Sequence, residues 1–148
     1  MTIEEKIVIA APPEVVWRIF SQLNQWNSWN PTCRQCCILK GTEISVGTCI
    51  SFVIRPFLFP LKIKSRILSW RPQQEAVWEG GRFGIHAIHR WQFRPAGTGT
   101  ELLSVETFRG PLVWLAYLLG IHRRLHRLTR IFLESAKRAS ERCANVDQ

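Results

Sequence analysis

Alternation of apolar and polar residues dominates the middle of the chain and predicts a series of β-strands. Between Leu61 and Trp70, for example, Lys62, Lys64 and Arg66 alternate with apolar or small residues, as in a strand with one buried face. A first strand is predicted at residues 3–10, and later strands at residues 33–40, 48–55, 61–70, 75–80, 85–94 and 100–109. Short turns rich in Gly and Pro separate the later strands, so we expect hairpins and an antiparallel meander.

Helical periodicity is found before and after this strand-rich region. Residues 14–21 and 24–30 predict two short helices between the first and second strands. The stretch from Gly110 to Arg142 predicts one long helix, because Pro111 suits a first turn and apolar residues then recur at steps of three and four. This stripe consists of Leu118, Ile121, Leu125, Leu128, Phe132, Ala136 and Ala139. Gly120 lies inside the predicted helix and weakens it by roughly 1 kcal/mol relative to Ala.

A sheet with one apolar face and a helix with one apolar stripe bury these surfaces most simply against each other. We therefore expect an α+β fold, in which a curved antiparallel sheet of about seven strands wraps around the long C-terminal helix. The sequence shows no repeats or linkers. Residues 1–142 are therefore expected to form a single domain, and residues 143–148 a tail.

Several short motifs, spread over nearly the whole chain, carry a resemblance to a known superfamily. They are Ile9 to Trp17 (IAAPPEVVW), Trp26 to Pro31 (WNSWNP), His89 to Phe93 (HRWQF), Gly99-Thr100, Glu106 to Pro111 (ETFRGP), Phe132-Leu133 and Ala136-Lys137. Together with the order of the predicted elements, they resemble the START/polyketide cyclase superfamily, also called SRPBCC, whose fold is the helix-grip. The resemblance implies the same fold here, with an apolar small molecule held between sheet and helix.

The inward faces of the predicted elements give the candidate lining of such a ligand-binding cavity. On the sheet the candidates are Phe52, Ile63, Ile67, Trp78, His89, Trp91, Phe93 and Val105. On the helix they are Tyr117, Ile121 and Leu125. His89 and Tyr117 are the polar side chains expected to orient a ligand. The alternative is that all these residues simply fill a core.

Alternate turns of a meander lie at the same end of the sheet, which gathers unusually apolar turns at one rim. The predicted cavity mouth consists of Phe57, Phe59, Phe83 and Trp114. We expect this rim to admit a lipophilic ligand or to touch a membrane or a partner. The basic run from His122 to Arg124, with Arg127, could hold the headgroup of an anionic lipid. The alternative is that the aromatic residues pack on one another and the arginines are solvated.

Two functions follow from these patterns. The favoured one is non-catalytic binding, and transport, of a hydrophobic small molecule or lipid. The second is a polyketide cyclase/dehydratase-like enzyme acting on an aromatic or polyketide substrate, with His89 and Glu106 as acid/base groups on paired strands. Strand alternation favours a plainer role for Glu106, in which it turns outward and pairs with Arg90 or Arg109.

The net charge suits several classes of partner, and the residue pattern of the strands argues against one of them. A formal net charge of +9 suits nucleic acid, an anionic membrane or an acidic small molecule. The outward cationic residues of the predicted strands have no aromatic residues between them, so we do not expect nucleic-acid binding. The oligomeric state is left open, a dimer included.

The cysteine and histidine spacings do not predict a metal site, and no cofactor is expected. Cys33 and Cys36 are not followed by a second Cys pair, and they would face opposite sides of a regular strand. His122 and His126 have helical spacing but lack the Glu of a metalloprotease motif. The odd count of five Cys, the lack of a signal-like start and a longest apolar run of about half a membrane span predict a cytoplasmic protein.

Overall fold

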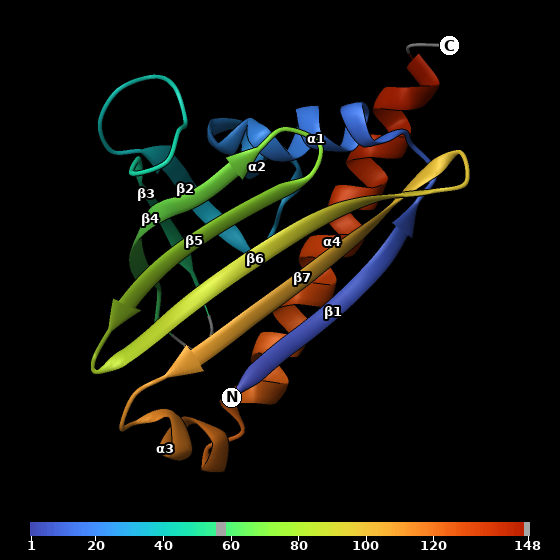
Figure 1. Ribbon diagram of the computed structural model, residues 1–148. Coiled ribbons are helices and arrows are strands. Elements are labelled where there is room, and N and C mark those ends of the chain that lie inside the picture. Colours follow the sequence, from blue (N-terminus) through green and yellow to red (C-terminus); the bar gives the residue numbers. More distant parts are fainter. Residues whose placement is uncertain (56–58, 147–148) are drawn as a thin grey trace.

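Seven antiparallel strands form one curled sheet that wraps around a C-terminal helix (Figure 1). The computed structural model describes residues 1–55 and 59–146. The strands are β1 (Thr2–Ile9), β2 (Cys33–Ile38), β3 (Cys49–Ile54), β4 (Leu61–Arg71), β5 (Glu75–Arg82), β6 (Ile85–Ala96) and β7 (Gly99–Arg109). The helices are α1 (Pro13–Ser21), the 3₁₀ turn η1 (Leu23–Gln25), α2 (Trp26–Trp29), α3 (Val113–Leu118) and α4 (Ile121–Val146). The predicted α+β helix-grip architecture is confirmed.

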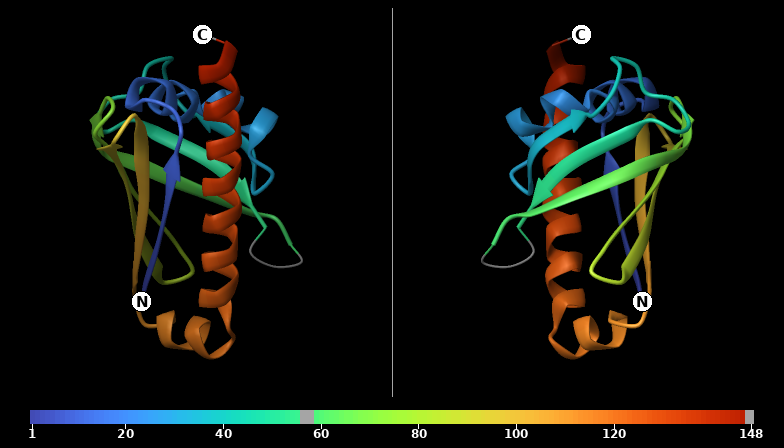
Figure 2. Two further views of the ribbon diagram at one scale, coloured as in Figure 1. Left: turned by 90° about the vertical axis from the view of Figure 1, so that its right-hand side faces the viewer. Right: turned by 90° about the vertical axis from the view of Figure 1, so that its left-hand side faces the viewer.

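The strand order β1-β7-β6-β5-β4-β3-β2 places the first strand beside the last. In β1–β7 the register runs from Thr2 opposite Thr107 to Ile9 opposite Thr100. The other pairs are hairpins between consecutive strands, as the short turns predict. In the two views of Figure 2 the sheet lies along one side of α4 and bends around it.

Side chains of α4 bind the edge strand β1 and so fix the helix across the open side of the sheet. Glu5 accepts a hydrogen bond from His126 Nδ1 at 2.6 Å and pairs with Arg130 Nε at 2.9 Å. Burial alone would raise the pKa of Glu5, but the hydrogen bonds from Arg130 and His126 lower it below its ordinary value. Farther along α4, Lys137 Nζ donates to the backbone oxygen of Val8 at 2.8 Å.

The predicted single long helix is wrong, because the chain forms two helices that meet at Gly120. Gly120 has φ 69°, a left-handed conformation that glycine adopts without steric cost and that ends α3. Leu118, which the predicted stripe would bury, is 70% exposed. α4 in turn continues past the predicted end at Arg142 to Val146, because Ala144 is buried in the core.

An aromatic cluster fills one end of the space between sheet and helix. Its centre is Phe20 of α1, which is 1% exposed. The Phe20 ring lies within ring-contact distance of Trp17, Trp26, Trp70, Trp78, Trp91, Phe93 and Phe132. The many Trp and Phe residues of the sequence therefore build a solid core at this end.

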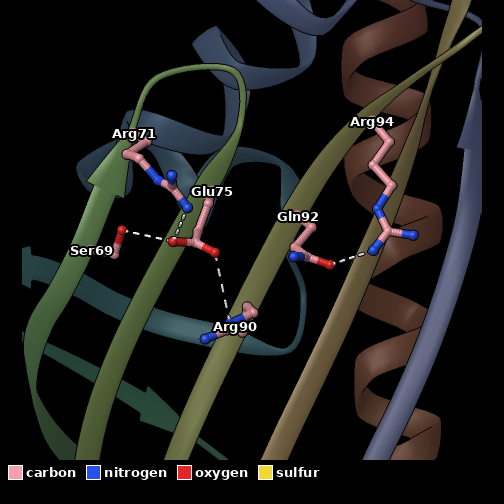
Figure 3. A network of polar contacts seen from close by, with 6 residues as sticks. All are labelled: Ser69, Arg71, Glu75, Arg90, Gln92 and Arg94. Carbon is pink, nitrogen blue, oxygen red and sulfur yellow. Dashed lines mark hydrogen bonds and ion pairs between the residues drawn. The ribbon is translucent and has the colours of Figure 1, made fainter.

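The outer face of the sheet carries a polar network centred on Glu75 (Figure 3). Glu75 Oε1 accepts hydrogen bonds from Ser69 Oγ and Arg71 Nη2, both at 2.8 Å, and Oε2 lies 3.8 Å from Arg90 Nε. Burial alone would raise the pKa of Glu75, but the hydrogen bonds from Arg71 and Ser69 lower it. A carboxylate thus sits among the cationic residues of this face.

Candidate functional site

A cavity of about 290 Å³ lies between the sheet and the helices, beyond the aromatic core. Strands β3 to β7 supply one wall, and α3 with the first half of α4 supplies the other. Of the predicted lining residues, the structure places these at the cavity: Phe52, Ile63, Trp78, His89, Trp91, Ile121 and Leu125. Most of the remaining lining is also apolar, for example Ile85, Leu128 and Phe132. Strand alternation and the helical stripe therefore identified much of this wall.

Four predicted lining residues lie elsewhere. Ile67 and Phe93 are buried in the core, 0% and 4% exposed, because α1 packs over that end of the sheet. Val105 lies opposite Arg90 in the β6–β7 register, on the outward face of β7. Tyr117 is 57% exposed, and its ring stacks on that of His122 at 4.4 Å, so it cannot orient a ligand inside the cavity.

The predicted mouth residues are only partly brought together. Phe83, in the turn between β5 and β6, lines the cavity and is 70% exposed. Trp114 and Phe59 are exposed but do not line it. Phe57 lies outside the described residues. Phe83 therefore lies at the α3 end of the cavity, and Trp114 is exposed on the same helix whose residues Val113 and Ala116 line the cavity.

His89 and Glu106 are two ionisable residues side by side in the cavity wall. They are direct partners in the β6–β7 register, so both side chains leave the sheet on the same face. His89 Nδ1 lies 3.8 Å from Glu106 Oε1, beyond hydrogen-bond distance. His89 Nε2 is 2.8 Å from Ser104 Oγ, and the imidazole stacks on Trp91 at 4.4 Å. The ring is therefore held in place while the Glu106 carboxyl remains available to a molecule in the cavity.

The prediction that Glu106 turns outward to Arg90 or Arg109 is wrong. Glu106 lines the cavity, and its side chain is 20% exposed. Leu102 and Leu103 put apolar residues on both faces of β7, so alternation alone did not identify the inward face. Pairing would have done so, since the short turn between β6 and β7 places Glu106 opposite His89.

Burial drives both groups toward their neutral forms. Desolvation raises the pKa of Glu106 to about 7 and lowers that of His89 to about 3. At neutral pH the imidazole is uncharged, and a substantial share of the carboxyl is protonated. Glu106 can then donate a hydrogen bond, or accept one after losing its proton, in an otherwise apolar cavity.

Two further polar groups at the cavity were not identified from the sequence. Asn30 is 2% exposed. Its Oδ1 accepts hydrogen bonds from the backbone nitrogen of Thr32 at 3.0 Å and from Thr32 Oγ1 at 2.7 Å. Its Nδ2 and the Nε1 of Trp91 have no hydrogen-bond partner among the described residues. Both residues line the cavity. The only signal for Asn30 in the sequence is its place directly after the short helix that carries Trp26 and Trp29.

Cys33 and Cys36 of β2 do not face opposite sides, as a regular strand would require. A bulge between Arg34 and Cys37, with Gln35 at φ 53°, turns Cys33 and Cys36 to the same buried face. Cys33 lines the cavity. Across residues 1–55 and 59–146, no group of three or more His, Cys, Asp or Glu side chains is placed to hold a metal ion.

Comparison with known proteins agrees with this architecture. The sequence matches the family model described as "Polyketide cyclase / dehydrase and lipid transport" over residues 1–141, so the chain belongs to this family. This confirms the resemblance drawn from the sequence motifs. No curated protein matches the sequence.

Solved structures share the fold at low sequence identity. The protein TTHA0849 from Thermus thermophilus has a TM-score of 0.81 and 14% identity, with 97% of this chain and 99% of that one covered. The Zhui aromatase/cyclase from Streptomyces sp. R1128 has a TM-score of 0.78 and 14% identity, covering 96% and 94%. The di-domain aromatase/cyclase StfQ of the steffimycin biosynthetic pathway has a TM-score of 0.74 and 13% identity, covering 99% and 51%. At these identities the likeness concerns the fold alone.

Within the part of the chain that the structure describes, no helix is long and apolar enough to cross a membrane.

Proposed function

We propose that this protein binds a hydrophobic small molecule non-covalently in the cavity between the sheet and α4. The observation that carries the proposal is the cavity itself, which has a mostly apolar lining and a paired polar site at His89 and Glu106. Small-molecule sites typically combine an apolar wall with a few polar groups that fix orientation. Release of water from this wall would supply roughly 25 cal/mol per Å² of buried apolar surface.

The polar pair narrows the chemistry of the ligand. A protonated Glu106 donates a hydrogen bond, and the neutral imidazole of His89 carries one N–H and one acceptor nitrogen. A carbonyl or hydroxyl oxygen on an apolar skeleton would satisfy Glu106 without bringing a charge into the cavity. At about 290 Å³ the cavity suits a small ligand, since binding sites usually occupy about 300–1,000 Å³.

Filling the cavity without disturbing the core tests this proposal. Ala87 of β6 lines the cavity, so Ala87→Leu places extra methyl groups in the ligand space. Ala96→Leu on the same strand, outside the cavity, is the matched control. Titration with the uncharged fluorophore N-phenyl-1-naphthylamine should show at least about tenfold weaker binding for Ala87→Leu only, because lost cavity space forces the probe back into water. Equal affinity in both variants, with unchanged melting temperatures, would contradict the proposal.

Native mass spectrometry of protein purified from its own source provides a second measurement. Protein that retains a small molecule should show a mass increment that disappears on denaturation. The increment would identify the ligand, which is expected to be apolar and to carry at least one oxygen.

The His89–Glu106 pair also favours a second candidate function, acid/base catalysis of a cyclisation or dehydration. A carboxyl with a pKa near 7 can both donate and accept a proton at neutral pH. The Ser104 hydroxyl and the Trp91 ring hold the imidazole beside it. The aromatase/cyclases among the structural neighbours support this candidate through their fold only.

The two functions differ in what happens to the bound molecule. A binding protein releases it chemically unchanged, and His89→Gln then alters affinity alone, whereas Trp91→Ala removes cavity wall and weakens binding. An enzyme should convert a polyketide-like or aromatic substrate, and Glu106→Gln should abolish turnover while the substrate still binds. Liquid chromatography with mass detection of the molecule before and after incubation separates these outcomes.

A further inference from the structure

The outer side of α3 and its two caps form an unusually apolar exposed surface. We call it the α3 patch; it consists of Leu112, Trp114, Leu115, Tyr117, Leu118 and Leu119. Trp114, Leu118 and Leu119 are 62%, 70% and 68% exposed. Single exposed apolar residues are ordinary, but six within eight consecutive positions indicate an interaction surface.

The α3 patch lies at the end of the cavity that α3 covers. The opposite side of the same short helix, Val113 and Ala116, lines the cavity. The β5–β6 turn is close to the start of α3, because a Cβ added at Gly84 would lie 4.0 Å from Leu112 Cδ1. Figure 2 shows α3 as a cap at the end of α4, on the side of the molecule opposite the C-terminus. One face of α3 therefore meets the cavity and the other meets the surroundings.

Positively charged residues flank the α3 patch in the sequence. The sequence contains no Asp or Glu between Glu106 and Glu134. Arg109 lies three residues before the first residue of the patch, and Arg123 and Arg127 follow the patch on the first turns of α4; all three are exposed. Trp, Tyr and Leu beside arginines are the residue types that bind the interface of an anionic membrane.

We propose that the α3 patch docks this protein on an anionic membrane, with the cavity mouth toward the bilayer. Leucine and tryptophan side chains of the patch enter the headgroup region, and the flanking arginines contact anionic lipid headgroups. A second copy of the chain fits this surface poorly, because a symmetric dimer would bring the exposed arginines of two copies together. An apolar molecule leaving the cavity past α3 would then enter lipid without crossing water.

Vesicle flotation with the full chain tests the docking. The variant Leu118→Ser/Leu119→Ser removes two exposed apolar side chains that do not line the cavity. Its matched control is Val8→Ser/Val46→Ser, which changes two residues that are 56% and 68% exposed and lie outside the patch. With vesicles of phosphatidylglycerol and phosphatidylcholine, the patch variant should bind at least about tenfold more weakly than wild type. The control should bind like wild type, and pure phosphatidylcholine should bind both poorly because headgroup attraction is lost.

Trp114 is a built-in reporter of depth, since it is 62% exposed while the other six tryptophans are buried or half-buried. Lipids brominated on their acyl chains should quench its fluorescence on binding, and Trp114→Phe should remove that quenching while preserving flotation.

Four outcomes would overturn the proposal. These are no flotation of wild type, equal flotation of the patch variant and wild type, flotation without quenching of Trp114, and a dimer in light scattering that the patch variant dissolves while no vesicle binds. Vesicle binding does not require an occupied cavity, so this test and the naphthylamine titration can fail independently.

Discussion

Replacing Glu106 by Gln should make the protein more stable at alkaline pH and leave it nearly unchanged in mild acid. Burial raises the pKa of the wild-type carboxyl to about 7 in the folded protein, against 4.5 in the unfolded chain. Below pH 4.5 it is protonated in both states, so stability carries no penalty. As pH rises from 4.5 to about 7, the unfolded chain releases its proton and the folded chain does not, so wild-type stability falls and then levels off.

The size of the effect follows from the two pKa values. Their difference corresponds to about 3 kcal/mol of unfolding free energy, since one pKa unit is worth about 1.36 kcal/mol. Gln has a similar shape and no titratable proton, so Glu106→Gln removes this penalty. The variant should exceed wild type by about 3 kcal/mol at pH 8 but by less than about 1 kcal/mol at pH 5. Any pH-independent effect of the amide cancels when the two differences are subtracted.

Urea denaturation followed by tryptophan fluorescence at pH 5 and pH 8 measures both differences. Glu43→Gln, at an exposed position in the loop between β2 and β3, is the control and should give the same small change at both pH values. If the gain from Glu106→Gln differed by less than about 1 kcal/mol between the two pH values, burial would not hold this carboxyl neutral and the reasoning would fail.

His89 should produce the opposite slope. Its pKa is lowered to about 3 in the folded protein, against 6.5 for the unfolded chain, so stability is lost as pH falls from about 6.5 toward 3. His89→Gln should therefore flatten the acid side of the wild-type stability profile and leave the alkaline side unchanged. The two opposite slopes overlap between about pH 4.5 and 6.5 and nearly cancel there, so the wild-type profile should be flat in that range and fall on either side of it. A variant profile that still falls as steeply on the acid side would contradict this assignment.

Three further predictions concern the scaffold. Phe20→Ala should cost about 3–5 kcal/mol in urea denaturation, because it removes the ring at the centre of the aromatic core. Gly110→Ala should cost at least about 2 kcal/mol in the same assay, since φ is 128° and a Cβ would clash with the backbone oxygen of Gly84; unchanged stability would refute that geometry. Mass mapping after brief alkylation should find Cys37, which is exposed, modified well before Cys36, which is buried, and equal rates would be inconsistent with the bulge in β2.

The fold could be predicted in outline because most strands have one apolar face and a clear turn beside them. The break at Gly120 could not, since a single glycine costs only roughly 1 kcal/mol in a helix and many helices contain one. Leu118 and Leu119 also continue the apolar pattern without being buried. Periodicity shows which residues share a helix face, but it does not show what that face contacts.

The candidate site was predictable where alternation had one answer, as for Phe52, Trp78 and His89. Alternation failed for Glu106, because apolar residues occupy both faces of β7 and only the pairing with β6 decides which face the Glu106 side chain is on. Helical periodicity failed for Tyr117, because α3 ends at Leu118 and Tyr117 is therefore not on one continuous helix with the lining residues of α4. Turn length and strand register therefore carry information about the site that residue pattern alone does not.

The pairing of β1 with β7 has a consequence for how the protein is made. Residues Thr2–Ile9 leave the ribosome about a hundred residues before their partner strand, Gly99–Arg109, is synthesised. Until then Ile3 and Ile9, which are fully buried in the finished protein, have neither a neighbouring strand nor the final helix to cover them. Long-range strand pairings of this kind form slowly, and the intermediates that precede them are prone to aggregation. Translation arrested before β7 should therefore yield a nascent chain that binds chaperones, whereas release of the complete chain should end that binding.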